Sequence, residues 1–267
     1  MTNREFLGLN LRALIAISWL VAGCVASAPA WAESDPAIPI PEKFAKDLEL
    51  FGDGVVGKAL PAPTITDIRE YLNLGKGTWE YQILKGGKAG QKVRSEKYEQ
   101  LPDEDGKAVW KRTIGTEFVE YWRLGGDAGI GKYLEDDLEL NYSSRFLPSI
   151  VWLAKMEPGV TQTLHHKIES FNTDKPDHVK YRGKMTAKLT YVGVYEITTP
   201  AGTWPAILAR SEFDIKIGPA NVTDTTYAFY AKGIGKIAEI ETTRVSALLI
   251  YHSSTRVAKV LTKYPKH

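Results

Sequence analysis

The chain of 267 residues has little cysteine and little net charge: it contains one cysteine and carries a formal charge of +2. A single cysteine excludes an intramolecular disulfide and a cysteine-based zinc site. The near balance of 34 basic and 32 acidic residues removes the electrostatic basis for binding nucleic acid. A hydrophobic content of 43% and a charged content of 25% are typical of a globular protein, so a disordered or collagen-like chain is also excluded.

Long apolar runs are also scarce, and the clearest one lies near the N-terminus. Basic residues precede an uncharged stretch, residues 13–32, which ends on the small-residue site Ala30-Trp31-Ala32. This order is typical of a secretory signal peptide. The strongly apolar part is shorter than the about 20 residues that a membrane helix needs. We therefore predict that residues 1–32 are a signal peptide cleaved after Ala32, and that the mature chain is periplasmic or secreted without a transmembrane span.

The cysteine gives the same segment a second interpretation. Val21-Ala22-Gly23-Cys24 resembles the lipobox of bacterial lipoproteins, in which the cysteine is lipidated and becomes the new N-terminus. Cys24 is therefore a candidate for lipid attachment, and an outer-membrane-anchored lipoprotein is the alternative localisation. Both interpretations export the protein. Cleavage after Ala32 leaves a mature chain without cysteine, which suits an oxidising compartment.

The mature chain divides into a proline-rich segment, residues 33–63, and a single β-rich domain, residues 64–267. In the first segment Phe44, Leu48 and Phe51 repeat at helical spacing, which predicts one short amphipathic helix on a tether. Charges of both signs surround these residues, and this mixture favours docking of the helix on the protein core over binding to a membrane.

Alternation of apolar and polar residues indicates strands in most of the larger segment. It is longest in residues 179–197, where apolar residues or glycines hold the odd positions. A strand of that length exceeds the usual limit of about ten residues, so we expect bends or bulges at Gly183 and Gly193. Residues 204–217 keep the alternation. Antiparallel pairing of the two segments then requires an odd-numbered loop around Pro200, or a bulge.

Short connections between these segments favour antiparallel order. About ten strands with hardly any helix predict a mainly β fold: a curved antiparallel sheet, as a half-barrel or open barrel, with one or two short helices. Residues 127–158 are the least regular part, and within them residues 146–155 fit either a short helix or an apolar strand.

Several motifs resemble a family of exported bacterial proteins of unknown function. The first strand begins Gly77-Thr78-Trp79-Glu80-Tyr81, and two later segments match the family's Pro-Ala-Gly-Thr hairpin and Tyr-Ala-x-Gly-Val-Gly motif: Thr199-Pro200-Ala201-Gly202-Thr203 and Tyr230-Ala231-Lys232-Gly233-Ile234-Gly235. Ile234 stands where the family usually has valine. The resemblance implies a half-barrel of the lipoprotein-carrier kind over residues 71–240, and it implies no catalytic residue.

Histidine supplies the main candidate for catalytic or metal chemistry. On a strand, the adjacent His165 and His166 point to opposite faces. A metal site that uses His165 and Glu169 would therefore need His178 or an acidic residue brought in from elsewhere. A metal-assisted periplasmic hydrolase is the enzymatic alternative that these residues define. No other catalytic set is evident, so we favour a non-enzymatic role and expect no cofactor.

Aromatic residues recur on most of the predicted strands. Their functional interpretation is an apolar concave surface for a lipid or acyl chain, and core packing is the alternative. The candidate face comprises Trp79, Tyr81, Trp110, Trp122, Tyr191 and Tyr195. The sequence thus predicts an envelope protein with a binding or chaperone-like role for an apolar ligand. A scaffold that adds a strand to another envelope protein is a further alternative.

Overall fold

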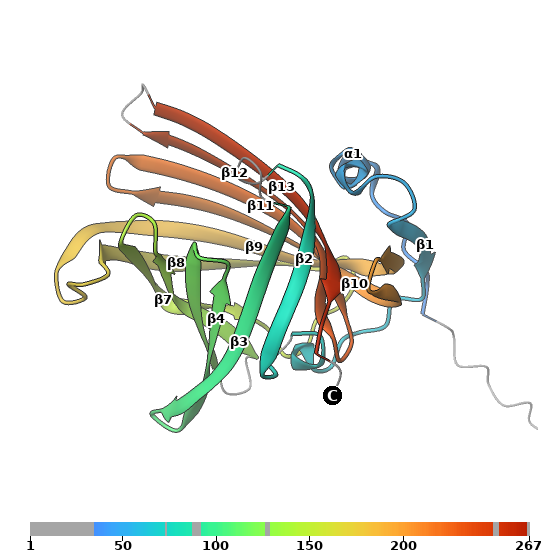
Figure 1. Cartoon of the computed structure of the whole chain (residues 1–267), viewed down its shortest axis with the longest axis horizontal. Coiled ribbons are helices and arrows are strands. Elements are labelled where there is room, and N and C mark those ends of the chain that lie inside the picture. Colours follow the sequence, from blue (N-terminus) through green and yellow to red (C-terminus); the bar gives the residue numbers. More distant parts are fainter. Residues whose placement is uncertain (1–34, 73, 87–91, 126–128, 248–250, 266–267) are drawn as a thin grey trace, which may run out of the picture. The chain divides into compact units, whose positions relative to one another are not determined.

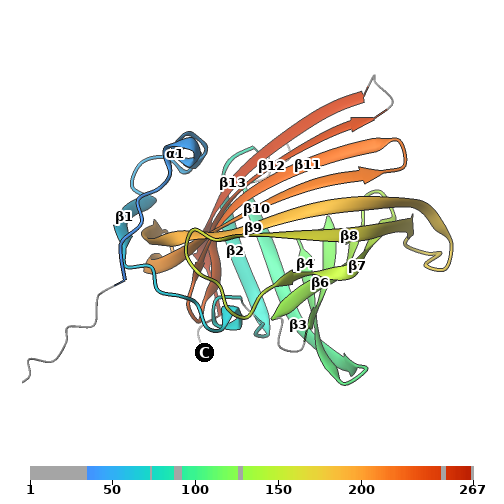
Figure 2. The ribbon, with the colours of Figure 1, turned by 180° about the vertical axis from the view of Figure 1, so that it is seen from behind.

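The strands of the protein form one antiparallel sheet that closes on itself (Figures 1 and 2). The computed structural model describes residues 35–72, 74–86, 92–125, 129–247 and 251–265. The strands are β1 (Val56–Leu60), β2 (Gly77–Lys85), β3 (Val93–Glu104), β4 (Lys107–Ile114), β5 (Phe118–Leu124), β6 (Ile130–Asp137), β7 (Tyr142–Trp152), β8 (Thr161–Asn172), β9 (Val179–Thr199), β10 (Gly202–Ile217), β11 (Ala220–Ala231), β12 (Gly235–Ala247) and β13 (Tyr251–Lys263).

Closure of the sheet distinguishes the observed fold from the predicted one. The strand order is β1-β9-β10-β11-β12-β13-β2-β3-β4-β5-β6-β7-β8, and β8 also pairs with β9. All strands except β1 therefore form a closed barrel. The mainly β, antiparallel class is confirmed. The half-barrel or open barrel is corrected to a closed one, because β8 and β9 pair along eleven registered positions and leave no gap between the two ends of the sheet.

The strand β9 closes the barrel because it has different neighbours along its length. It pairs with β8 through residues 179–190, with β1 through residues 194–197, and with β10 along most of its length. The hairpin to β10 has a two-residue loop, Pro200-Ala201, and a bulge at Val192 restores the pairing of odd with odd positions. The expected bulge is thus confirmed beside Gly193.

At Gly183 the structure shows a close approach of two strands in place of a bulge. The β9–β10 register is unbroken there, and a Cβ atom added to Gly183 would lie 2.2 Å from the carbonyl oxygen of Lys216. The missing side chain therefore lets β10 pair tightly with β9. The lysines and arginine at even positions from 180 to 188 are exposed on the outer face, as their alternation predicted.

The N-terminal segment packs against the outer face of the barrel. Its helix α1 (Glu42–Leu48) carries Phe44, which packs edge-on against Tyr227 with ring centroids 5.5 Å apart. Asp47 accepts a hydrogen bond from the Tyr227 hydroxyl and forms an ion pair with Arg256 of β13. The predicted helix and its docking are confirmed. Since β1 also pairs with β9, residues 35–63 pack as part of the same compact unit as the barrel.

The chain between β1 and β2 packs into one end of the barrel. Ile65 pairs with Met156, and the Ile68 amide donates to the Ala154 carbonyl at 2.9 Å. Both isoleucines are buried in an apolar cluster that includes Tyr191. We call this segment, residues 61–72 and 74, the end plug.

The region predicted to be least regular contains two strands. β6 lies within it and was not predicted, and β7 extends to Trp152, so the apolar run from residue 146 is a strand rather than a helix. Within the described part of the chain, no helix has the length and apolar character needed to cross a membrane.

The close approach at Gly183 predicts a stability defect. Gly183→Val should lower the free energy of unfolding by about 1–3 kcal/mol, because the new side chain collides with the β10 backbone. Lys184→Val changes the neighbouring exposed position and should have little effect. Urea denaturation of both variants measures the difference, and equal midpoints would show that the strands can separate there without cost.

Candidate functional site

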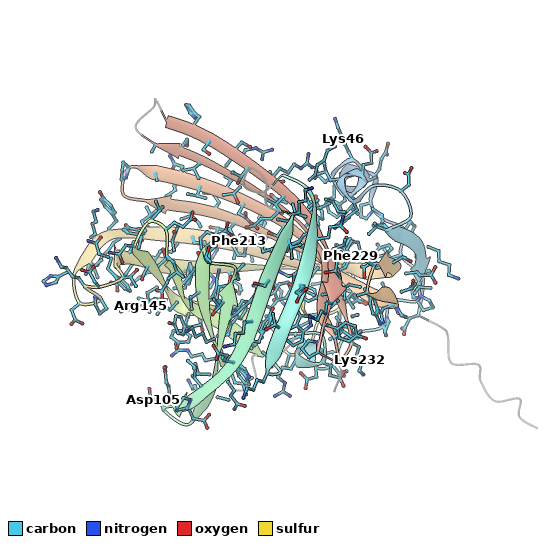
Figure 3. All side chains as sticks on the ribbon, viewed as in Figure 1. Lys46, Asp105, Arg145, Phe213, Phe229 and Lys232 are labelled. Carbon is cyan, nitrogen blue, oxygen red and sulfur yellow. The ribbon has the colours of Figure 1, made fainter. Side chains whose placement is uncertain are left out.

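The barrel encloses a cavity of about 360 Å³. Strands β3 to β7 and β9 to β13 all contribute side chains to its lining, so the cavity is the lumen of the barrel. Phe213 of β10 is one of these residues and lies between opposite sides of the barrel (Figure 3). Pockets for small organic ligands usually measure about 300–1,000 Å³, so the lumen is large enough for such a ligand.

The lumen has two chemically different walls. The apolar wall is formed by β7, β9, β10 and β11 and includes Phe146, Met185, Phe213, Ile215 and Val222. The charged wall is formed mainly by β3 to β6, β12 and β13. Because the two walls share one cavity, the lumen can contact the apolar and polar parts of a single molecule at once.

Glu96 occupies the centre of the charged wall. Its side chain is fully buried, and its carboxylate lies 2.7 Å from Lys259 Nζ, 2.7 Å from Arg112 Nη2 and 3.2 Å from Lys236 Nζ. Burial alone would raise the pKa of Glu96, but these three cations hold it well below the ordinary value. Glu96 is therefore a carboxylate at neutral pH.

Further ion pairs extend from Glu96 in both directions. Glu120 accepts from Arg112 Nη1 at 2.7 Å and contacts Lys132 Nζ at 3.3 Å, whereas Glu239 lies 2.8 Å from Lys259 Nζ. We call the connected set the ion network; it consists of Arg112, Lys132, Lys236, Lys259, Glu96, Glu120, Glu135 and Glu239. Its four cations balance its four carboxylates.

Two lumenal carboxyl groups lie outside this balance. Asp224 accepts hydrogen bonds from the hydroxyls of Thr226 and Thr243, at 3.0 and 2.6 Å. Glu241 also lines the lumen. Burial, and then the negative charges of Glu239 and Asp224, raise the pKa of Glu241 to about 7. Among the described residues neither Asp224 nor Glu241 forms an ion pair, so this part of the lumen is acidic.

Most of the predicted aromatic face lies inside the barrel. Trp122 lines the lumen, and Trp110 lines a smaller pocket beside it. Trp79 and Tyr81 are buried next to the ion network: the Trp79 indole donates to the Ile234 carbonyl at 3.1 Å, and the Tyr81 hydroxyl donates to the Lys236 carbonyl at 2.9 Å. Contact of these residues with a ligand stays a prediction.

The other two predicted aromatics occupy different environments. Tyr191 is buried against the end plug, and its hydroxyl donates to the Pro63 carbonyl at 3.1 Å. Tyr195 packs against Phe229 on the outer face, in the cluster that α1 covers. Tyr195 is not part of the lining of the lumen, although its apolar cluster also contains Trp79 and Tyr81.

The histidines do not form a site with Glu169. His165 contacts the Thr186 hydroxyl on the exposed face, whereas His166 Nδ1 lies 2.8 Å from the Pro148 carbonyl oxygen. Glu169 forms ion pairs with two arginines. In the described residues no group of three or more His, Cys, Asp or Glu side chains is arranged to hold a metal ion, so the structure lends no support to the metal-assisted alternative.

The sequence interpretation missed the ion network, although a signal for it is present. On β3 the even positions hold Arg94, Glu96 and Tyr98, and on β5 they hold Phe118, Glu120 and Trp122. Charged and aromatic residues that share one face of a strand indicate an enclosed polar interior, because large aromatic side chains rarely line a fully solvated face. The predicted positions Cys24 and Ala32 lie outside the described residues.

Comparison with known proteins gives two structural neighbours. No protein-family model and no curated protein matches the chain. A "putative exported protein with YmcC-like fold" from Bacteroides fragilis is 14% identical, with a TM-score of 0.39 over 73% of this chain and 99% of its own. A "putative lipoprotein" from Parabacteroides distasonis is 13% identical, with a TM-score of 0.35 over 73% and 98% of the two chains. These similarities are too low to assign a function, which must be argued from the lumen itself.

The central position of Glu96 predicts a large stability effect. Glu96→Gln should lower the free energy of unfolding at pH 7 by about 3–5 kcal/mol, because three buried cations lose their shared carboxylate. Glu99→Gln removes a solvent-screened carboxylate from the same strand and should change the stability little. Chemical denaturation measures both values, and a similar small loss in the two variants would contradict the assigned role of Glu96.

The raised pKa of Glu241 predicts a pH-dependent stability. Below its ordinary pKa of 4.5 the group is neutral in both the folded and the unfolded state. As the pH rises from 4.5 to about 7, Glu241 ionises in the unfolded state but stays largely protonated in the folded state. The free energy of unfolding therefore falls over this range. Glu241→Gln should therefore be more stable than the parent by about 1–3 kcal/mol above pH 7, and equally stable below pH 4. Unfolding curves across this range measure the difference, and a pH-independent difference would contradict the prediction.

Proposed function

We propose that the protein is an exported, non-enzymatic binding protein of the cell envelope that holds an apolar, lipid-like ligand in its barrel. The observation that carries this proposal is the apolar wall of the lumen. Its side chains border a cavity of about 360 Å³ instead of meeting across the barrel. Protein interiors are otherwise packed with few voids larger than a water molecule, so a lumen of this size is better explained by a ligand than by core packing.

The ion network supports a binding role over a catalytic one. Its charged groups are engaged with each other in the folded protein, which leaves no evident free nucleophile among them. A general acid or base needs access to a proton on the substrate. Buried groups that already satisfy one another supply a fixed polar surface for a ligand instead.

The export part of the proposal comes from the N-terminal sequence. Residues 1–32 have the order of a signal peptide, with cleavage after Ala32 or lipid attachment at Cys24 as the two routes. Either route exports the barrel, and in the cell envelope an apolar ligand, such as the acyl chain of a lipid or of another envelope protein, is plentiful.

Native mass spectrometry of the protein purified from its own envelope tests both parts of the proposal. It reports the N-terminal processing, any lipid on Cys24 and any retained ligand in one measurement. We expect a non-covalent adduct that chloroform–methanol extraction removes and that fragments as a lipid. Recovery of the bare polypeptide alone, from gentle detergent-free preparations, would contradict lipid binding.

A cavity-filling pair of variants locates the ligand. Val222→Trp places a large side chain in the lumen, and Thr223→Trp places it on the exposed outer face of the same strand. We expect the first variant to lose the adduct and the second to keep it, because only the first reduces the lumenal volume. Loss of the adduct in both, or in neither, would show that the ligand binds elsewhere. The thermal midpoint of each variant reports whether it still folds.

A further inference from the structure

A second, smaller pocket lies between the end plug and the lumen. It measures about 60 Å³, and Leu72 and Leu74 of the end plug form part of its lining. It shares Arg112, Trp122 and Tyr230 with the lining of the lumen. The two spaces therefore adjoin at these three side chains.

One residue that lines the pocket carries a buried donor without an acceptor. Trp110 lines it and is only 8% exposed, and in the described part of the chain its Nε1–H has no hydrogen-bond partner. Two neighbouring tryptophans differ in this respect, since Trp79 donates to the Ile234 carbonyl and Trp122 donates to Glu120. An indole nitrogen can only donate, and burying an unpaired donor is unfavourable. The Trp110 indole is therefore suited to an oxygen acceptor of a ligand.

The electrostatics of the pocket favour an acceptor that carries negative charge. Its ionisable lining includes the cations Arg112 and Lys236 and no carboxylate. Burial, and then the repulsion of Arg112, lower the pKa of Lys236 to about 8, even though Glu239 and Glu96 act in the opposite direction. A further anion beside Lys236 would therefore offset the repulsion between Lys236 and Arg112.

The pocket is large enough for a small polar group. Its volume of about 60 Å³ exceeds the ~10–15 Å³ that a single water molecule needs on this measure. A carboxylate head group fits this space. The apolar wall of the adjoining lumen then receives the hydrocarbon part of the same molecule.

We propose that this pocket is a carboxylate subsite, in which Trp110 Nε1 donates a hydrogen bond to the head group of a long-chain carboxylate whose tail occupies the lumen. The inference rests on the proposed lipid-binding function and names the class of ligand for it. The subsite is bordered by Tyr230 of β11 and Lys236 of β12, which pair with each other. The acidic part of the lumen, formed by Asp224 and Glu241, lies further along the same two strands. It therefore contacts the tail side of the ligand and disfavours a head group entering in the opposite direction.

Three matched probes test the head group: dodecanoate, dodecan-1-ol and dodecylamine, titrated calorimetrically into the mature protein below their aggregation concentrations. We expect dodecanoate to bind at least about tenfold more tightly than dodecan-1-ol. The two probes have the same tail, but the carboxylate also accepts a charge-assisted hydrogen bond and is attracted by the cations of the pocket. We expect the amine to bind most weakly. A preference for the amine would overturn the subsite and assign head-group binding to Asp224 and Glu241.

Trp110→Phe tests the donor itself, and Trp204→Phe, which alters a ring packed on Tyr264 at the hairpin end, is the matched control. We expect Trp110→Phe to weaken dodecanoate about tenfold and to leave dodecan-1-ol unchanged, while the control changes neither. Equal weakening of both probes would overturn the hydrogen bond but leave lumenal binding intact. Failure of all three probes to bind would contradict the proposed function together with the subsite.

The indole proton gives a readout in the unaltered protein that does not depend on how a variant folds. In ¹⁵N-labelled protein, dodecanoate should move the Trp110 Nε1–H resonance downfield, and dodecan-1-ol should move it much less. A resonance that stays unchanged while dodecanoate binds would show that the pocket holds water only, and would overturn the proposal. The resonance is assigned by its loss in Trp110→Phe.

Discussion

The interior of this protein depends on the two neighbours that β9 has along one edge. Its first part pairs with β8 and its last part with β1, while the opposite edge pairs with β10. The pairing with β8 joins the two ends of the sheet, and a closed sheet has no free edge along its barrel strands. Without that pairing the lumen would be one face of an open sheet, and the charges on it would be in water.

Closure of the barrel raises the free-energy cost of every charged side chain that faces inward, because it removes that side chain from water. A buried ion is tolerated when it is paired and hydrogen-bonded, and the ion network meets this condition by giving Glu96 three cations and Arg112 two carboxylates. The ion pairs offset the free-energy cost of burying the charges of this wall. They do not by themselves make the fold more stable, because the attraction between the charges is offset by the loss of their hydration. What the network contributes is a polar surface of fixed geometry beside an apolar one.

Much of the fold could be predicted from the sequence, because period-two alternation reports which face of a strand is buried. The alternation identified β9, β10 and the bulge between them, and helical spacing identified α1. Closure could not be predicted, since the β8–β9 pairing depends on the curvature accumulated by the whole sheet. The same bulge explains the placement of Tyr195: strict alternation puts Tyr191 and Tyr195 on one face, but the extra residue at Val192 turns Tyr195 to the outer face.

The candidate site was only partly predictable for a related reason. The aromatic residues were recognised as a possible interior, whereas the charged residues that share their strand faces were not. Alternation alone cannot tell which face of a strand is solvated when both faces carry polar residues. On β3 the exposed Lys97 and the buried Glu96 are adjacent in the sequence, and the long-range contact of Glu96 with Lys259 shows which of the two faces the lumen.

The ion network also explains why the apolar wall remains uncovered. An apolar lumen of this width could shrink if side chains from the opposite wall moved across it. Here the opposite wall combines the lysine, arginine and glutamate side chains of the ion network with Ile114, Phe118 and Trp122. A network side chain that left its ion pairs to fill apolar space would leave a buried charge with fewer partners, at a cost of several kcal/mol. The charged wall therefore keeps the cavity open as well as polar. An amphipathic ligand is the occupant that satisfies both walls at once, because its tail covers the apolar side chains and its head group reaches the polar end without breaking the network.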